Sequence, residues 1–397
     1  MLTALSPTQS FNFFSTNITT TSFPPILPTD FIVDHFNSRI QSSSTKKIKT
    51  LTKSNLTRGI EQERCSGREI TRLSALASHK PPAQRKTSPS VLCKGCRELI
   101  DKVLKRHSKK WEKNEENYRN FTSMLRRSCR GFEKAIITQS NTPVGTKIVY
   151  DAQRTKTLRV TPAIFNTFIK EHPFSSRTFS TCAVVGNGGI LMDSGCGKTI
   201  DSAQFVMRCN LPPLSGEYGK HVGVRTDLVT ANPTIFKDKY KSLSERRRDV
   251  VERLQSYGKS LILIPAFSFG VNTQVSLRVA YTLEDFASPS RAVFFNPDYL
   301  RNLSRFWASN GLKSPRLSTG LMMASLALEA CSDVHLFGFW PFGHHPYGLY
   351  TLTNHYYDDH KANRRLHAMP VEFDLLLKLH SRGVLKLHLR RCQTSKN

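Results

Sequence analysis

The amino-acid sequence predicts an α/β fold, in which a mostly parallel, Rossmann-like sheet is flanked by helices on both faces. From about Lys147 onward, short apolar runs alternate with amphipathic stretches. Alternation of this kind is typical of parallel strands joined by helices that cover the sheet. One apolar run, Ala183 to Val185, leads directly into a glycine-rich turn, the place where α/β proteins hold phosphate-bearing ligands.

The individual elements follow from local composition. Short apolar runs bounded by turn residues predict strands at CAVVG (182–186), DLVTA (227–231), SLILIPA (260–266), AVFFN (292–296) and VHLFGF (334–339). Longer amphipathic or apolar stretches between them predict helices that include ERRRDVVERLQSY (245–257), PDYLRNLSRFWASN (297–310) and LMMASLALEAC (321–331).

Two segments precede this region. Residues 1–90 are rich in Ser, Thr, Pro and Lys without sustained periodicity, which predicts a low-complexity, disordered stem. Residues 91–146 form a basic lead-in that contains cysteines and a stretch, 102–120, with charges at near-helical spacing, interpreted as a solvated helix face. Cys93 and Cys96 have the spacing of half a zinc site, but Cys129 is the only further thiol nearby and no His stands at ligand spacing. No metal site is predicted.

The charge balance indicates anionic partners. The formal net charge is +28, which suits nucleic acid, an acidic membrane surface or negatively charged small molecules. A nucleic-acid-binding protein is the alternative from a different class, but aromatic residues for base stacking are sparse in the basic stretch. Nucleic acid is therefore not expected as a partner.

The sequence gives two opposing indications of compartment. No window reaches the length of a membrane-spanning apolar helix, and the first residues lack the charged start and apolar centre of a signal peptide. Nine cysteines nevertheless suit an oxidising secretory lumen, as do four N-glycosylation sequons, which lie at Asn17, Asn55, Asn120 and Asn302.

The glycine-rich turn nearly matches two nucleotide motifs. Gly197-Lys198-Thr199 is the ending of a P-loop, but Met192 stands where the first glycine is required. The dinucleotide fingerprint likewise has Gly186 and Gly188 and then Leu191 at its third glycine. The turn therefore indicates a nucleotide without specifying which.

Four stretches together form a more specific pattern. The first runs from Cys182 to Pro233 and contains GNGGIL and RCNLPP; the second, STGL followed by GFWPF, places Ser318, Thr319 and Gly320 at a helix N-terminus, which favours an anion. The third is HYYD at residues 355–358, and the fourth is HAMPVEF at residues 367–373, which precedes a helix. In this order they resemble the large, small, third and very-small sialylmotifs of the animal sialyltransferases, and most closely those of the α-2,8 branch.

The resemblance implies a GT-A-like variant of the Rossmann fold, with residues 147–397 as the catalytic domain. CMP-sialic acid is the implied donor, and a sialylated glycan on a glycoprotein or glycolipid is the implied acceptor. By this resemblance Asn187 and Asn210 hold the nucleotide and phosphate, and the cytidine and phosphate are enclosed by Ser318, Thr319, Gly320 and Trp340. Two alternatives stay open: Asn187 as a turn residue with positive φ, and Trp340 as a core side chain.

The implied chemistry needs few groups. Departure of the CMP phosphate leaves an oxocarbenium-like centre, so the protein must position the acceptor and remove one proton. By the resemblance, His367 matches the family's general base. A histidine suits this role, because the imidazole pKa of ~6.5 lies near the pH of a mildly acidic lumen. His355 matches the histidine that stabilises the departing phosphate. An Asp-x-Asp that would bridge a diphosphate through a metal is absent, and a monophosphate donor needs no bridge, so neither a metal nor another cofactor is expected.

The resemblance also implies two disulfides, Cys182–Cys331 and Cys196–Cys392. Cys209 lies between strand-like residues and is expected to be a buried free thiol. The resemblance implies a Golgi membrane location with a lumenal catalytic domain, although no anchor helix is visible in this sequence. A polysialyltransferase remains an alternative, but the segment before STGL carries only a few spread charges. The pair His344 and His345 in GHHPYGLY is interpreted as two surface residues.

Overall fold

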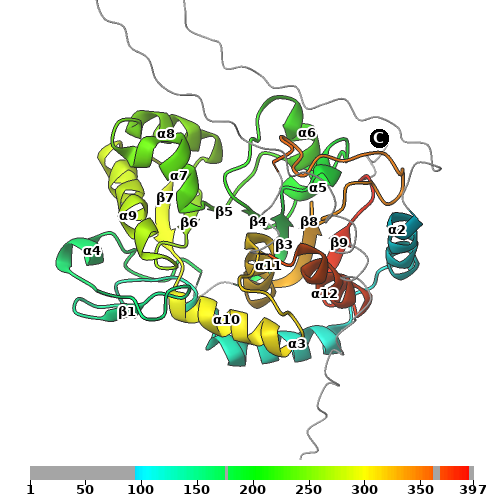
Figure 1. Cartoon of the computed structure of the whole chain (residues 1–397), viewed down its shortest axis with the longest axis horizontal. Coiled ribbons are helices and arrows are strands. Elements are labelled where there is room, and N and C mark those ends of the chain that lie inside the picture. The colour runs from blue at the N-terminus through cyan, green and yellow to red at the C-terminus, as the bar shows by residue number, and fades with distance from the viewer. Residues whose placement is uncertain (1–93, 175–177, 361–366, 393–397) are drawn as a thin grey trace, which may run out of the picture.

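The computed structural model describes residues 94–174, 178–360 and 367–392, which are organised around a seven-stranded sheet (Figure 1). The strand order is β7-β6-β5-β4-β3-β8-β9 and every neighbouring pair is parallel. The strands are β3 (Phe179–Val185), β4 (Phe205–Arg208), β5 (Leu228–Thr230), β6 (Leu261–Ile264), β7 (Arg291–Phe294), β8 (Cys331–Phe337) and β9 (Lys386–His388). All five predicted strands are present, and the predicted fold class is confirmed; β4 and β9 are additional.

The sheet is buried on both faces, which explains its nearly continuous apolar strands. Val184 and Val185 are adjacent in β3 and point to opposite faces, yet both are buried. The first face packs against α2 (Lys94–His107), α3 (Glu115–Cys129), α10 (Pro297–Ser309), α11 (Thr319–Ala330) and α12 (Met369–Ser381). The second face packs against α5 (Gly197–Asp201), α6 (Gly219–Val222), α7 (Pro233–Lys239), α8 (Arg247–Leu254) and α9 (Gly270–Asp285). Two apolar cores, one on each face, therefore support the sheet.

Smaller elements complete this arrangement. An antiparallel pair, β1 (Lys147–Val149) and β2 (Thr157–Arg159), lies beside the short helix α4 (Pro162–Asn166). Figure 1 shows both near α9, at the β7 side of the molecule.

The lead-in is part of the first core rather than a detached segment. Ile100 of α2, together with Phe121 and Leu125 of α3, is buried in the same cluster as the sheet. The basic stretch 102–120 is not one helix, because α2 ends at His107 and α3 begins after the N-cap Asn114, whose side chain accepts the Asn117 N–H at 2.9 Å. Its charges lie on the exposed sides of the two helices and on the linker between them.

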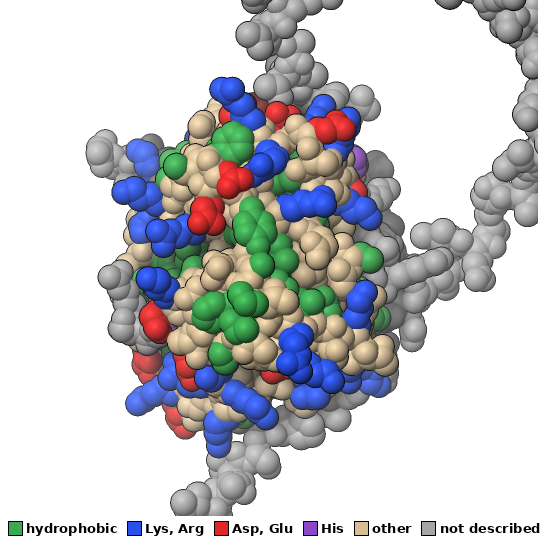
Figure 2. All heavy atoms as spheres, turned by 90° about the vertical axis from the view of Figure 1, so that its left-hand side faces the viewer, with side chains coloured by type: hydrophobic (Ala, Val, Ile, Leu, Met, Phe, Trp, Pro, Cys, Tyr) green, Lys and Arg blue, Asp and Glu red, His purple; other side chains and the backbone are tan. Residues whose placement is uncertain are grey.

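The basic residues are distributed over the surface. Figure 2 shows the side of the molecule near α4 and α9, where Lys and Arg side chains surround an apolar centre and alternate with acidic ones. Three exposed apolar residues belong to α9 or its C-terminal cap: Val271, Tyr281 and Phe286.

Both expected disulfides are present. Cys182–Cys331 joins the neighbouring strands β3 and β8, and Cys196–Cys392 joins the N-cap of α5 to the segment after β9. Cys209 is a buried free thiol, as expected, and burial raises its pKa to about 12. Cys96 is disulfide-bonded and therefore not available as a zinc ligand. Cys129 is a buried free thiol, and Cys93 lies outside the described residues.

Candidate active site

The candidate site lies where the strand order reverses. From β3 the chain continues to β4 on one side, and only later returns to β8 on the other side. Ligands of α/β sheets bind beyond the carboxyl ends of the strands at such a switch point. Three predicted residues occupy this edge, since Asn187 follows β3, Asn210 follows β4 and Trp340 follows β8.

The glycines of the turn serve close backbone packing. A Cβ on Gly188 would lie 2.5 Å from the carbonyl oxygen of Gly338 and 3.3 Å from that of Trp340. A Cβ on Gly189 would collide with the carbonyl of Thr353. The turn thus brings the segments after β3 and β8 and the loop before His355 together without side chains between them.

Asn187 is fixed by neighbouring strands and still has one unused polar atom. Its Nδ2 donates to the carbonyl of Cys209 at 2.8 Å and lies 3.4 Å from the hydroxyl of Tyr357. Its Oδ1 is buried and accepts no hydrogen bond from the described residues. Asn210 has a φ of 59°, and its N–H donates to the Thr230 hydroxyl at 2.9 Å. Asn187 is not among the described residues with positive φ, so the alternative interpretation of it as a positive-φ turn residue is wrong. The positive φ occurs at Asn210 instead.

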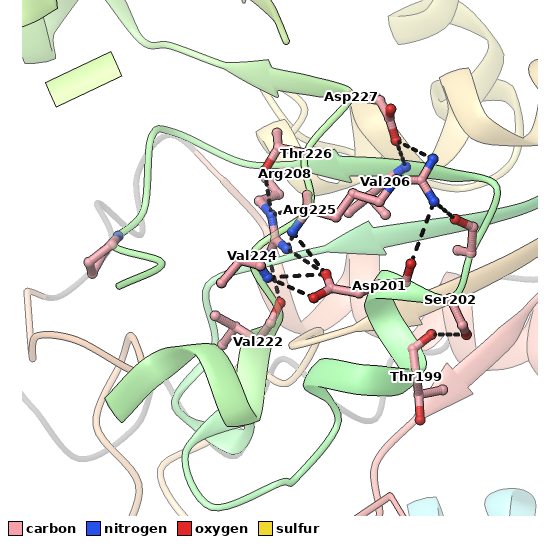
Figure 3. Close-up of polar contacts among 12 residues, drawn as sticks. Thr199, Asp201, Ser202, Val206, Arg208, Val222, Val224, Arg225, Thr226 and Asp227 are labelled. Carbon is pink, nitrogen blue, oxygen red and sulfur yellow. Dashed lines mark hydrogen bonds and ion pairs between the residues drawn. The ribbon is translucent and has the colours of Figure 1, made fainter. Parts of the chain in front are cut away.

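A buried arginine holds the strand end that carries Asn210 (Figure 3). The guanidinium of Arg208 is fully buried and donates to the carbonyls of Val222 at 2.8 Å and Arg225 at 2.7 Å, and to the Thr226 hydroxyl at 2.9 Å. Asp201 lies 3.7 Å from it and accepts the backbone N–H of Arg225 at 3.0 Å. The arginine of the RCNLPP motif is therefore a structural residue whose donors are used internally.

The N-terminus of α11 supplies the second part of the site. The Ser318 side chain caps the helix by accepting the Leu321 N–H at 3.1 Å, and its own N–H donates to Oε1 of Glu372 at 2.8 Å. Glu372 is buried, and burial raises the pKa of its carboxyl. A Cβ on Gly320 would lie 2.9 Å from the ring of Phe339, and one on Gly186 would lie 3.4 Å from the same ring. Phe339 thus connects this helix end to the glycine turn.

His367 has a defined tautomer. Its Nδ1 lies 3.1 Å from the carbonyl oxygen of Arg316, which can only accept, so Nδ1 carries the hydrogen. In the neutral ring Nε2 is then the basic nitrogen. Burial lowers the pKa of His367, and the hydrogen bond to Arg316 partly opposes this. The imidazole is accordingly arranged to accept a proton at Nε2.

His355 is held by an aspartate. Its Nδ1 donates to Oδ1 of Asp358 at 2.7 Å, and its Nε2 lies 3.2 Å from Nδ2 of Asn354. The ring stacks on Tyr357 at a centroid distance of 5.2 Å, and the backbone of His355 pairs with Gly188. His355 therefore adjoins the glycine turn, whereas His367 adjoins the segment before α11.

In the loop between β8 and His355, the predicted surface position of one histidine is wrong. His345 is not a surface residue, since only 5% of it is exposed. Its ring stacks on Tyr350 at 4.7 Å, its Nδ1 accepts the Tyr347 N–H at 3.1 Å, and burial lowers its pKa to about 4. His344 is half-buried, and its carbonyl accepts the indole N–H of Trp340 at 2.8 Å.

Trp340 is buried, and its ring packs edge-to-face against those of Phe342 and Phe373. Both its indole N–H and its ring therefore have partners within the fold. The assignment of this residue to the nucleotide stays a prediction.

The other predicted sites are spread over the molecule. Asn120 is exposed on α3 and Asn302 is half-buried on α10, while Asn17 and Asn55 lie outside the described residues. Within residues 94–174, 178–360 and 367–392, no group of three or more His, Cys, Asp and Glu side chains could hold a metal ion. None of the helices in these ranges is both long and apolar enough to span a bilayer.

Two residues of the site were not identified from sequence. Tyr357 contacts Asn187, and Arg316 supports His367. Arg316 stands two positions before Ser318, so its place beside the STGL motif was the signal available in the sequence. Its contact with His367, 51 positions later, is visible only in the fold.

Comparison with known proteins assigns the family. The model of glycosyltransferase family 29 (sialyltransferase) matches residues 136–384. The human protein named alpha-2,8-sialyltransferase 8E is 46% identical over 295 residues, which cover 74% of this chain and 78% of that protein. The Xenopus tropicalis alpha-N-acetylneuraminide alpha-2,8-sialyltransferase is 43% identical over 305 residues, which cover 77% of this chain and 88% of that protein.

Solved structures of lower similarity also match. The crystal structure of a mammalian sialyltransferase in complex with Gal-beta-1-3GalNAc-ortho-nitrophenol is 18% identical with a TM-score of 0.40, over 74% of this chain and 86% of that one. The Campylobacter jejuni sialyltransferase CstII in complex with cytidine-5'-monophosphate is 17% identical with a TM-score of 0.33, over 54% of this chain and 82% of that one. On the family match and the sequence identity to these relatives, the chain belongs to glycosyltransferase family 29, the sialyltransferases.

Proposed function

We propose that this chain transfers sialic acid from CMP-sialic acid to the 8-hydroxyl of a terminal sialic acid on a glycoprotein or glycolipid glycan, with inversion. The names of the relatives at 42–46% identity support this linkage. The observation that carries the mechanism is the hydrogen bond from Nδ1 of His367 to the carbonyl of Arg316, which leaves Nε2 as the proton acceptor. A positioned general base of this kind contributes about 10²–10⁴ in rate.

The other site residues receive complementary roles in this proposal. The glycine turn with Asn187 and Asn210, and the α11 N-terminus with Ser318, Thr319 and Gly320, face the CMP part of the donor. The free Oδ1 of Asn187 is an acceptor suited to a hydroxyl or amine of the nucleotide. His355 is assigned the stabilisation of the departing phosphate, and the hydrogen bond between its Nδ1 and Asp358 holds the ring in place for this role.

The chemistry is proposed to proceed without a metal, because a monophosphate leaving group can be neutralised by histidine and backbone N–H donors. A Golgi lumenal location is proposed as well. The two disulfides support an oxidising compartment.

The test is incubation of the purified chain with CMP-sialic acid and a panel of sialylated and non-sialylated acceptors, followed by linkage analysis. An α-2,8 product formed with inversion and at full rate in excess EDTA supports the proposal. Transfer only to galactose or N-acetylgalactosamine, or a strict requirement for Mn²⁺, would overturn it.

A further inference from the structure

Arg316 is a cation placed beside the proposed base. Its carbonyl accepts the His367 hydrogen bond at 3.1 Å, and it precedes the α11 N-cap Ser318 by two residues. The backbone of Arg316 thereby touches both the base and the start of the helix assigned to the donor. Its side chain also acts electrostatically on His367, since its positive charge contributes to the lowering of the His367 pKa.

The guanidinium of Arg316 has unused hydrogen-bonding capacity. The residue is half-buried, and its guanidinium carbon lies 4.8 Å from the centroid of the Phe269 ring. Within the part of the chain that the structure describes, no side-chain hydrogen bond or ion pair of Arg316 is formed; Asp151 acts on it only as a nearby charge. The cation–π contact with Phe269 leaves the N–H groups of the guanidinium available to a ligand.

Two other arginines of low exposure, Arg208 and Arg301, have partners for their donors. Arg208 uses its donors on backbone carbonyls and a hydroxyl. Arg301, which also faces Asp151, donates to the carbonyl of Val149 at 2.7 Å and pairs with Asp298. Burial of an arginine without such partners is costly, so the unused edge of Arg316 indicates an anionic ligand.

The proposed acceptor supplies that anion. A terminal sialic acid carries a carboxylate, and an arginine matches a carboxylate through two parallel N–H···O bonds. We propose that the guanidinium of Arg316 binds the carboxylate of the acceptor's terminal sialic acid and so presents the 8-hydroxyl of that sugar to Nε2 of His367. The inference rests on the proposed function, and it makes Arg316 a residue that selects an already sialylated acceptor.

The experiment compares two acceptors that differ only in the terminal sialic acid, whose carboxylate is either free or converted to its primary amide. Transfer from CMP-sialic acid is measured for the wild type, Arg316→Gln and the matched control Arg301→Gln. In the wild type the amide should lower kcat/KM by roughly 10- to 100-fold, the size of a lost charge-assisted contact. Arg316→Gln should lose a similar factor with the free acid and show no further loss with the amide. Arg301→Gln should remain fully sensitive to the amide.

Three readouts separate the possible failures. Unchanged CMP affinity of Arg316→Gln shows that the donor site and fold persist; if that variant does not fold, Arg316→Lys takes its place and should show an intermediate loss with partial sensitivity to the amide. An Arg316 variant that responds to the amide as fully as the wild type overturns the inference, and so does a wild type indifferent to it. A wild type that binds CMP but forms no α-2,8 product from either acceptor instead refutes the proposed function.

Discussion

Oε1 of Glu372 accepts the backbone N–H of Ser318 at 2.8 Å, across 54 residues of sequence, and so joins the first turns of α11 and α12. Glu372→Ala would leave this buried N–H without a partner, which costs about 1–3 kcal/mol. Glu372→Gln keeps an amide oxygen that can accept, so its loss should be smaller. Urea denaturation at one pH, together with CMP affinity, measures both variants. Equal losses in the Ala and Gln variants would mean that the hydrogen bond is not what positions the helix end.

The two histidines should separate in kinetics. His367→Ala should lose roughly 10²–10⁴ in kcat while CMP affinity stays nearly unchanged, because the base faces the acceptor. His355→Ala should weaken CMP binding as well, because His355 adjoins the glycine turn. Steady-state kinetics and CMP titration of both variants test this. Unimpaired turnover in His367→Ala would show that another group removes the proton.

The pH profile of the reaction provides a further test of His367. A base acts in its neutral form, and burial lowers the pKa of His367. The acid limb of kcat/KM should therefore fall at a pH below the ~6.5 of a free imidazole. An acid limb well above that value would assign it to a different group.

Glu329 should make stability depend on pH. Burial raises its pKa from 4.5 to about 7, and Tyr299 donates to its Oε1 at 2.7 Å. Because the folded state binds this proton more tightly than the unfolded state, the contribution of Glu329 to stability is largest below pH ~4.5 and falls by about 3 kcal/mol as the pH rises to about 7. Glu329→Gln should therefore stabilise the protein at pH 8 and leave it unchanged at pH 4. Urea denaturation at both values measures the effect, with Glu98→Gln, an exposed position on α2, as the control. Equal gains at both pH values would contradict it.

The disulfides should contribute strongly to stability. Cys182–Cys331 and Cys196–Cys392 close segments of 149 and 196 residues, and each should stabilise the fold by about 2–5 kcal/mol. Paired Cys→Ser variants measured by thermal unfolding test this. Cys209→Ser is the control without a bridge. Peptide mapping of native protein that found the four bridged thiols free would contradict the pairing.

The sequence predicted the fold class because the central strands are buried on both faces and therefore appear as uninterrupted apolar runs, such as Ala183–Val185. The strands it missed are short. β9 has three residues, which are too few to show an alternating apolar pattern in the sequence. It lies at the edge of the sheet, beside β8. Helix α9 was missed because its buried face includes Thr273 and Ser276, whose hydroxyls are satisfied by backbone carbonyls at 3.0 and 2.7 Å.

The candidate site was recognised by motif, but the partners of its residues required the fold. His367 was identified from its motif, whereas its tautomer depends on the Arg316 carbonyl. His345 was placed on the surface because two adjacent histidines in a loop carry no periodicity; only the tertiary structure shows Tyr350 stacked on it.

The placement of Cys196–Cys392 imposes an order on assembly. Cys196 lies soon after β3, whereas its partner follows β9, the last strand of the sheet. The bond can form only after β8, α12 and β9 have been synthesised, because Cys392 follows all three in the chain. Formation of this bond thus requires that the segment after β3 and the segment after β9 have come together. A chain that stalls before β9 keeps Cys196 as a thiol, by which folding factors in an oxidising compartment could distinguish it from a finished molecule.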